Sequence, residues 1–254
     1  MQIPFIREVD RPRAIREVLH RRTDLSTFVV HLTKDTDDGN QAATNLLSII
    51  QQRRIFARSP MGWATTKDPQ THAPFVVGPA LDSQRVVSFS ETPLEHVYSL
   101  FANIAGRQVK LSPYGVAFTK MVARRIDVNP VWYVDMTRGR DWVICTALNE
   151  LVRASAAAFD GSSISKITPF VEGMGTWPEM QHEFWWEREW RHVNDIDLTS
   201  VWTKTIWLAP EEAFEWLRPH LYGRPIIDPR WSLEEIIGHL AGLEAEDMSP
   251  FVAH

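Results

Sequence analysis

The sequence has little of what defines secreted and membrane proteins. Among its 254 residues there is one cysteine, Cys145, so the chain cannot form an internal disulfide. Uncharged apolar stretches such as residues 131–134 are far shorter than the roughly 20 residues that a membrane-spanning helix needs. Arg7, Glu8 and Asp10 interrupt any signal-peptide core. These absences predict a soluble protein of the reducing cytoplasm that makes no membrane contact.

Neither sign of charge is in large excess, and the common glycine motifs are missing. The 27 Lys and Arg residues against 32 Asp and Glu give a net charge of −5, which argues against a general nucleic-acid coat because phosphate binding needs local positive charge. The chain has no GxGxxG, GxxxxGK or GxSxG, which argues against a dinucleotide-binding Rossmann domain, a P-loop enzyme and an α/β-hydrolase. HExxH and CxxC are also missing, so no metal site is predicted. The missing motifs leave catalysis by carboxylate side chains as the chemistry that the sequence favours.

What the chain does contain predicts one compact domain of the α+β class. Its hydrophobic content of 44% is ordinary for a globular protein, and no repeat or linker divides it. Strand and helix patterns are mixed without regular alternation, which favours a mixed, mainly antiparallel sheet with flanking helices. We expect a helical N-terminal extension at 1–27, the main domain at 28–222, and a strand and helix appendage at 223–254 packed on that domain.

Periodicity and capping signals place the elements along the chain. Strands are predicted at 28–33, 86–90, 114–119, 130–135, 164–171, 183–193 and 201–208, and another is expected to begin within 53–58. Helices are predicted at 10–22, 43–50, 93–101, 121–126 and 142–159, from Pro210, and from Ser232, where Ser-Leu-Glu-Glu matches a capping box. Thr92 is the expected cap of the helix that starts at Pro93. Residues 35–40 are read as a turn, and 60–79 and 172–182 as loops.

The most informative stretch is the predicted strand at 183–193. Alternation along a strand places Glu187, Glu189 and Arg191 on one face, with the two carboxylates about 7 Å apart. Burying two like charges is costly unless a ligand or an arginine compensates. The pattern therefore indicates either a carboxylate site or an exposed face of Glu–Arg pairs that contribute little energy.

His31 and Cys145 are two further residues whose side chains can take part in catalysis. In the strand at 28–33, alternation puts Phe28, Val30 and Leu32 on one side, and Val29, His31 and Thr33 on the other; a strand histidine is either structural or catalytic. Cys145 lies in an apolar helix and is best interpreted as a core residue rather than a nucleophile.

Several stretches, in this order, resemble the AbiGi-like abortive phage-infection proteins. They are His31-Leu32-Thr33, the helix at 45–50, residues 86–94, residues 114–120, residues 129–134 and Glu187-Arg188-Glu189-Trp190-Arg191. The resemblance covers about residues 28–240. The same order also resembles DarT-like ADP-ribosyltransferases, in which an early strand carries His-x-Thr and a late strand carries a catalytic Glu. The resemblance thus implies an ADP-ribosyltransferase-like fold with NAD as substrate.

The resemblance assigns binding roles to residues of three strands and to two arginines. It implies the following NAD-binding residues: His31 and Thr33 at the nicotinamide ribose, Ser88, Phe89 and Ser90 in the middle strand at the nicotinamide, and Arg58 or Arg191 at the pyrophosphate. Residues 60–79 are expected to cover the NAD.

For catalysis, the resemblance implies that Glu189 binds the ribose 2′-hydroxyl and stabilises the oxocarbenium-like ribose, much as a carboxylate does in glycoside hydrolysis. Glu187 would orient or deprotonate the acceptor nucleophile. Both roles require that Glu187, Glu189 and His31, which are remote in sequence, line one cleft.

Three functions follow as hypotheses. The first is a phage-defence enzyme that transfers ADP-ribose from NAD to a macromolecule, with DNA or RNA as candidate acceptors. The second is a non-enzymatic antitoxin or sensor of an abortive infection system that binds a toxin or other protein partner. The third is hydrolysis of NAD with water as acceptor.

Overall fold

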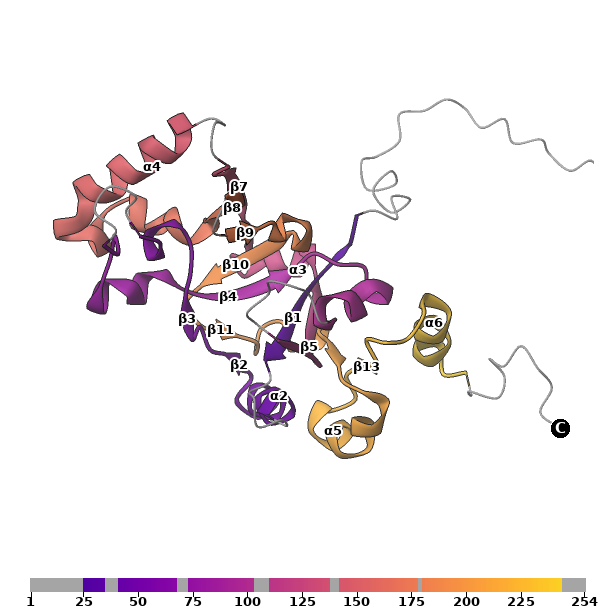
Figure 1. The fold of residues 1–254 in the computed structure, drawn as a ribbon. Coiled ribbons are helices and arrows are strands. Elements are labelled where there is room, and N and C mark those ends of the chain that lie inside the picture. The colour runs from indigo at the N-terminus through magenta and orange to yellow at the C-terminus, as the bar shows by residue number, and fades with distance from the viewer. Residues whose placement is uncertain are drawn as a thin grey trace, which may run out of the picture.

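The computed structural model describes residues 25–34, 41–67, 73–102, 110–137, 142–177 and 180–243. The predicted helix at 10–22 and the turn at 35–40 lie outside these residues. Within them the protein is a compact α+β fold with a mixed, mostly antiparallel sheet and packed helices (Figure 1).

The main sheet has eight strands in the order β13-β12-β5-β1-β4-β10-β6, with β3 pairing the beginning of β4. The strands are β1 (Phe28–Lys34), β3 (Ser59–Pro60), β4 (Arg85–Ser90), β5 (Leu111–Thr119), β6 (Asn129–Pro130), β10 (Glu189–Val193), β12 (Ile206–Leu208) and β13 (Ile226–Ile227). All of these pairs are antiparallel except β12 with β13. The strands predicted from alternation at 28–33, 86–90 and 114–119 are confirmed.

Two smaller sheets accompany the main one. The three-stranded sheet consists of β7 (Trp132–Asp135), β8 (Val171–Trp177) and β9 (Met180–His182), and the two-stranded sheet of β2 (Arg54–Ile55) and β11 (Ile196–Asp197). In the first of these, β7 and β8 run parallel although about 40 residues separate them in sequence. The parallel pairing is possible because a helical connection joins the two strands.

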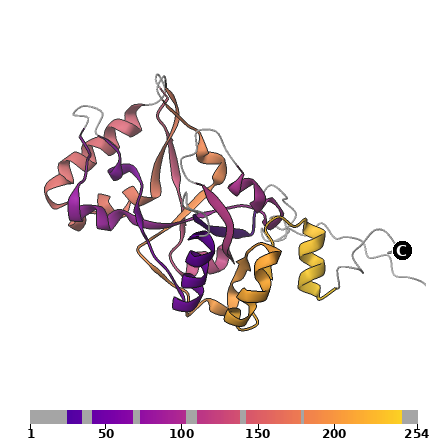
Figure 2. The ribbon, with the colours of Figure 1, turned by 60° about the horizontal axis from the view of Figure 1, so that its bottom comes forward.

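One face of the main sheet is covered by two helices, α2 (Gln41–Gln52) and α5 (Phe214–Leu221). Leu46 and Ile49 of α2 and Leu217 of α5 are buried in one cluster with Val29 and Phe89 of the sheet. Figures 1 and 2 both show α2 beside α5 on this side. We call this face the core face.

The other face is divided between two coverings. Near β12 and β13 it meets α6 (Leu233–Ala241) and the 3₁₀ segment η3 (Leu94–Phe101), whose buried residues form a second cluster. Near β4 and β10 it meets the three-stranded sheet and the lobe around α4 (Trp142–Ser155), which has its own core that includes Cys145. Figures 1 and 2 place α4 and α6 at opposite ends of the molecule. The remaining helix, α3 (Lys120–Arg125), follows β5.

Short 3₁₀ segments replace several predicted elements. Residues 164–171 are not a strand but η5 (Ile164–Lys166) and η6 (Thr168–Phe170), because Pro169 cannot donate to a ladder. The other segments are η1 (Trp63–Thr65), η2 (Gly78–Gln84), η4 (Ala156–Gly161), η7 (Phe184–Glu187), η8 (Trp202–Lys204) and η9 (Glu211–Ala213). The predicted Thr92 cap is also wrong: η3 begins after Pro93 and has no side-chain cap. The capping box at Ser232 is confirmed.

Two regions interpreted as loops are built differently. Within 172–182, β8 and β9 form an antiparallel pair, and Gly173 and Gly175 allow Met136 and Thr137 to approach the chain closely. Within 60–79, Trp63 is buried in the core of the α4 lobe and donates to the Asn149 side chain at 2.9 Å. That part of the segment is therefore a packed element of the lobe.

Candidate functional site

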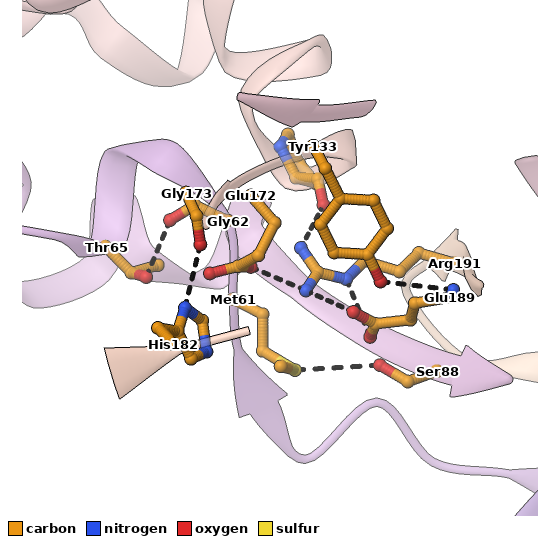
Figure 3. A network of polar contacts seen from close by, with 11 residues as sticks. Met61, Gly62, Thr65, Ser88, Tyr133, Glu172, Gly173, His182, Glu189 and Arg191 are labelled. Atoms are coloured by element: carbon orange, nitrogen blue, oxygen red, sulfur yellow. Dashed lines mark hydrogen bonds and ion pairs between the residues drawn. The ribbon is translucent and has the colours of Figure 1, made fainter. Parts of the chain in front are cut away.

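The candidate site centres on Arg191 of β10, whose side chain is completely buried. Its guanidinium donates to both oxygens of Glu189, from Nε at 2.9 Å and from Nη2 at 2.7 Å. Nη2 also donates to Glu172 Oε2 at 2.6 Å, and Nη1 donates to the Pro169 carbonyl at 2.8 Å. We call Glu172, Glu189 and Arg191 the Arg191 network (Figure 3).

The electrostatics of the Arg191 network depend on pairing. Burial by itself would lower the pKa of Arg191, but the adjacent carboxylates of Glu189 and Glu172 outweigh burial and raise that pKa above its usual value. Arg191 therefore stays charged. Glu189 and Glu172 keep 15% and 17% of their side chains exposed, so neither residue is completely buried.

Tyr133 of β7 also contacts Glu189. Its hydroxyl accepts a hydrogen bond from the Glu189 backbone N–H at 3.2 Å. Burial and the negative charge of Glu189 raise the pKa of Tyr133 above its usual value, so the phenol keeps its proton and can act as a donor. Tyr133 lies opposite Glu172 in the parallel pair of β7 and β8. The three-stranded sheet thus supplies both a phenol and a carboxylate to the strand that carries Glu189.

The register of the main sheet decides which side chains share a face. Glu189 pairs with Ser90, and Arg191 with Ser88, and directly paired residues in antiparallel strands project to the same side. Ser88 and Ser90 therefore lie on the same face as the Arg191 network; we call this the network face. Ser88 Oγ is 3.6 Å from Met61 Sδ, and Ser90 is buried.

His31 lies on the opposite face. Ser90 pairs with Val30 of β1 as well as with Glu189, so Val30 shares the network face and His31, one residue later, points to the core face. The His31 ring is 5.6 Å from the Phe89 ring, and its Nδ1 is 2.8 Å from the Ser88 carbonyl oxygen. The prediction that His31 and Glu189 line one cleft is therefore wrong: strand alternation was read correctly, but the register between strands separates them.

Two more of the predicted binding residues lie away from the Arg191 network. Phe89 is 1% exposed and packs between His31 and Phe118 in the core, so its ring is covered and cannot stack on nicotinamide. Thr33 is buried, and its hydroxyl lies 3.0 Å from the Ala42 carbonyl oxygen and 3.1 Å from that of Tyr114. It joins the start of α2 to the sheet.

The charged residues also differ from the expectation. Glu187 does not share a strand with Glu189, because η7 ends at Arg188 in the left-handed conformation, with φ of 48°; it does lie near enough to Tyr133 to help raise the pKa of that phenol. Arg58 is exposed beside the beginning of β4, whereas Glu189 pairs with its end. Arg191 holds two carboxylates and a carbonyl rather than offering its guanidinium to a pyrophosphate.

A hollow of about 370 Å³ opens where β4 ends and η7 meets β10. It is lined by residues 91–93, Ser99, Trp185, Trp186 and Arg188. The Glu91 N–H donates to the Arg188 carbonyl at 3.1 Å, one residue before Glu189. The hollow and the Arg191 network are thus adjacent along the chain.

Sequence reasoning missed Glu172 and Tyr133. Glu172 was read as the start of a loop, and Tyr133 as one of several aromatic strand residues. The sequence does contain a signal for Glu172, because this acid directly follows the apolar residue Val171. An acid beside buried residues needs a compensating partner. Its partner could not be named because the parallel β7–β8 pairing is set by the tertiary fold.

Comparisons with protein-family models, with curated proteins and with solved structures find no match to this chain. Among the described residues, no helix is long and apolar enough to cross a membrane, and no group of three or more His, Cys, Asp or Glu side chains is placed to hold a metal ion. The function is therefore inferred from the geometry of the site and from the sequence resemblance.

Proposed function

We propose that this protein is an ADP-ribosyltransferase of an abortive phage-infection system, with an ADP-ribosyltransferase-like fold and NAD as substrate. It would cleave the N-glycosidic bond between nicotinamide and ribose and transfer ADP-ribose to a macromolecular acceptor, for which DNA and RNA remain candidates. The phage-defence context and the choice of NAD come from the resemblance to the AbiGi-like and DarT-like families.

Strand adjacency supports the proposal. The resemblance assigned the NAD site to an early, a middle and a late strand, and the corresponding β1, β4 and β10 are neighbours in the sheet in that order. These strands are distant in sequence, so their adjacency is not a consequence of chain connectivity. The proposal keeps the role of Glu189 and drops the roles assigned to four other residues, His31, Thr33, Phe89 and Arg191. It also drops the requirement that His31 and Glu189 line one cleft, because the two side chains lie on opposite faces of the sheet.

The observation that carries the proposal is the setting of Glu189. Its carboxylate is held by a buried guanidinium, remains partly exposed, and lies on the same face as Ser88 and Ser90. Developing positive charge on a ribose is stabilised by a fixed carboxylate, because the group needs no reorganisation at the moment of reaction. Arg191 orients Glu189, and the Tyr133 hydroxyl can donate to a substrate oxygen beside it.

A second candidate is the non-enzymatic antitoxin or sensor. It is favoured by the fact that both Glu189 oxygens already accept hydrogen bonds from Arg191. The network also joins β10 to Glu172 and Pro169 of the covering lobe. On this interpretation the charged residues fix the two parts together, and a partner protein binds elsewhere on the surface.

A matched pair of carboxamide variants separates the two candidates. Glu189→Gln and Glu172→Gln each remove one of the two negative charges that contact Arg191, but only Glu189 is assigned to catalysis. Each purified protein is incubated with labelled NAD and a bacterial lysate. The proposed enzyme requires that Glu189→Gln lower label transfer by roughly 10²-fold or more, while Glu172→Gln, if folded, stays within about tenfold of the wild type.

Two outcomes would reject the role of Glu189. One is equal transfer by the wild type and by Glu189→Gln. The other is equal loss in both variants together with equal loss of folding, measured by circular dichroism, which would mark the network as structural. Free ADP-ribose without labelled acceptor would instead indicate hydrolysis, and absence of NAD turnover with a co-purifying protein would favour the antitoxin or sensor.

A further inference from the structure

The hollow beside η7 carries two exposed tryptophans in succession. Trp185 is 53% exposed and Trp186 is 38% exposed; Trp132 and Trp216 are exposed singly elsewhere, and Trp63, Trp190, Trp202 and Trp207 are buried. Large aromatic rings normally remove their area from water. Two of them that remain exposed where the surface is concave provide flat apolar platforms for a ligand.

The hollow has one arginine that a ligand can reach. Glu91 lies between two cations, with Lys120 Nζ at 2.8 Å and Arg188 Nη1 at 3.5 Å from its Oε1. The Arg188 side chain is 45% exposed, so its guanidinium can contact a ligand while it stays near Glu91, and guanidinium geometry suits phosphate.

Stacking surface and positive charge together define the ligand chemistry. Aromatic side chains stack on nucleobases of any sequence, and an adjacent arginine binds the phosphate joined to the base. The volume of about 370 Å³ lies at the lower end of the range for small-molecule sites, which suits one ring with its sugar and phosphate.

We propose that this hollow binds a nucleotide unit, with its base stacked on Trp185 or Trp186 and its phosphate at Arg188. Pro93 and Ser99 also line the hollow. The inference does not depend on ADP-ribosyl transfer, because neither Glu189 nor Arg191 lines the hollow.

Calorimetric titration with three probes tests the two halves of the site. Adenosine monophosphate has the ring and the phosphate, adenosine has the ring alone, and inorganic phosphate has the anion alone. We expect the monophosphate to bind most tightly and inorganic phosphate most weakly. Trp185→Ala or Trp186→Ala should weaken both adenosine and the monophosphate at least tenfold, and Trp185→Phe or Trp186→Phe should restore most of that binding.

Arg188→Asn is the matched change for the anion, since asparagine tolerates the left-handed backbone of this residue. It should weaken the monophosphate about tenfold and leave adenosine unchanged. Trp216→Ala is the control, because Trp216 is 40% exposed on α5, outside the hollow. The proposal is overturned if no probe binds, or if Trp185→Ala and Trp186→Ala both bind the monophosphate like the wild type.

Competition then identifies the source of the nucleotide unit. If NAD displaces the monophosphate and depends on the same tryptophan, the hollow holds part of the dinucleotide. If a short single-stranded oligonucleotide does so instead, the hollow holds a base of a nucleic-acid strand. Glu189→Gln should retain monophosphate binding in either case, so a failure of the proposed transfer reaction can be told apart from a failure of this site.

Discussion

The two faces of the main sheet differ most along β4, where successive residues enter opposite environments. Val87 and Phe89 project into the apolar core with α2 and α5, whereas Ser88 and Ser90 project toward the Arg191 network. The core face gains stability from buried apolar area. The network face buries a charge that must be compensated by its partners.

The difference in burial and charge indicates that the two faces contribute differently to stability and to function. Buried ion pairs are weak stabilisers because desolvation offsets much of their attraction, and apolar residues of similar volume often serve stability as well or better. A protein that could fill the network face with apolar residues instead places Glu172, Glu189 and Arg191 there. We interpret the core face and the apolar part of the network face beside β12 and β13 as the sources of stability. The part of the network face beside β4 and β10 is where charge is positioned for function.

The largest expected effect comes from removing the cation. Arg191→Met leaves Glu172 and Glu189 partly buried without a counter-ion, and we expect the free energy of unfolding to fall by about 3–5 kcal/mol. Urea unfolding followed by circular dichroism measures it. Arg191→Lys, which keeps the charge but not the fork of donors, should lose less. A loss below about 1 kcal/mol in Arg191→Met would contradict the importance of the pairing.

Replacing the whole network should have the opposite outcome. Glu172→Met, Glu189→Leu and Arg191→Met combined remove all three charges, so the triple variant should be close to wild-type stability or more stable by about 1–4 kcal/mol. The same unfolding experiment applies, and transfer of label from NAD should be lost. A triple variant as unstable as Arg191→Met alone would show that the network itself stabilises the fold.

Two adjacent residues offer a finer comparison of the faces. Val87 is 2% exposed in the core, and Val87→Ala should cost about 1.5–2.5 kcal/mol through lost apolar burial. The hydroxyl of Ser88 contacts a sulfur at 3.6 Å, a weak contact, and Ser88→Ala should change stability by less than about 0.5 kcal/mol. Equal costs for the two variants would remove the distinction drawn between the faces.

The smallest expected effect is a dependence on pH at the core face. Burial lowers the pKa of His31 from its ordinary value of 6.5, partly offset by the Ser88 carbonyl. Between the lowered pKa and pH 6.5, the unfolded chain binds more protons than the folded one. Stability therefore falls as pH decreases below about 6.5.

Denaturant midpoints between pH 5 and 8 test this dependence. His31→Gln should flatten the decline on the acid side relative to the wild type. His239, whose pKa is also lowered by burial, supplies the control His239→Gln, which should leave the contribution of His31 in place. Parallel curves for the wild type and His31→Gln would contradict the assignment.

The sequence predicted the inner strands well because alternation in them is strong. The division of β1 into Phe28, Val30 and Leu32 on one side and Val29 and His31 on the other agrees with the two core clusters. The sequence could not predict which side of the sheet each set would take relative to β10. That depends on the register among β1, β4 and β10, which the fold as a whole determines.

The predicted strand at 183–193 was wrong in its first half for a local reason. The chain leaves η7 through a left-handed residue at Arg188. Glycine or asparagine at that point would have indicated the break, but arginine rarely adopts this conformation and gives no such signal. The prediction that Glu189 and Arg191 share a face is confirmed, because the two residues lie two positions apart within β10.

That left-handed residue has a consequence for how the protein can diverge. Because Arg188 is in the left-handed conformation, β10 begins at Glu189, and the turn with the two tryptophans lies outside the strand. Insertions or deletions in this turn can reshape the hollow while the buried charges keep their places. Homologues with altered ligand preference should therefore vary in the length and aromatic content of this turn before they vary in the sheet.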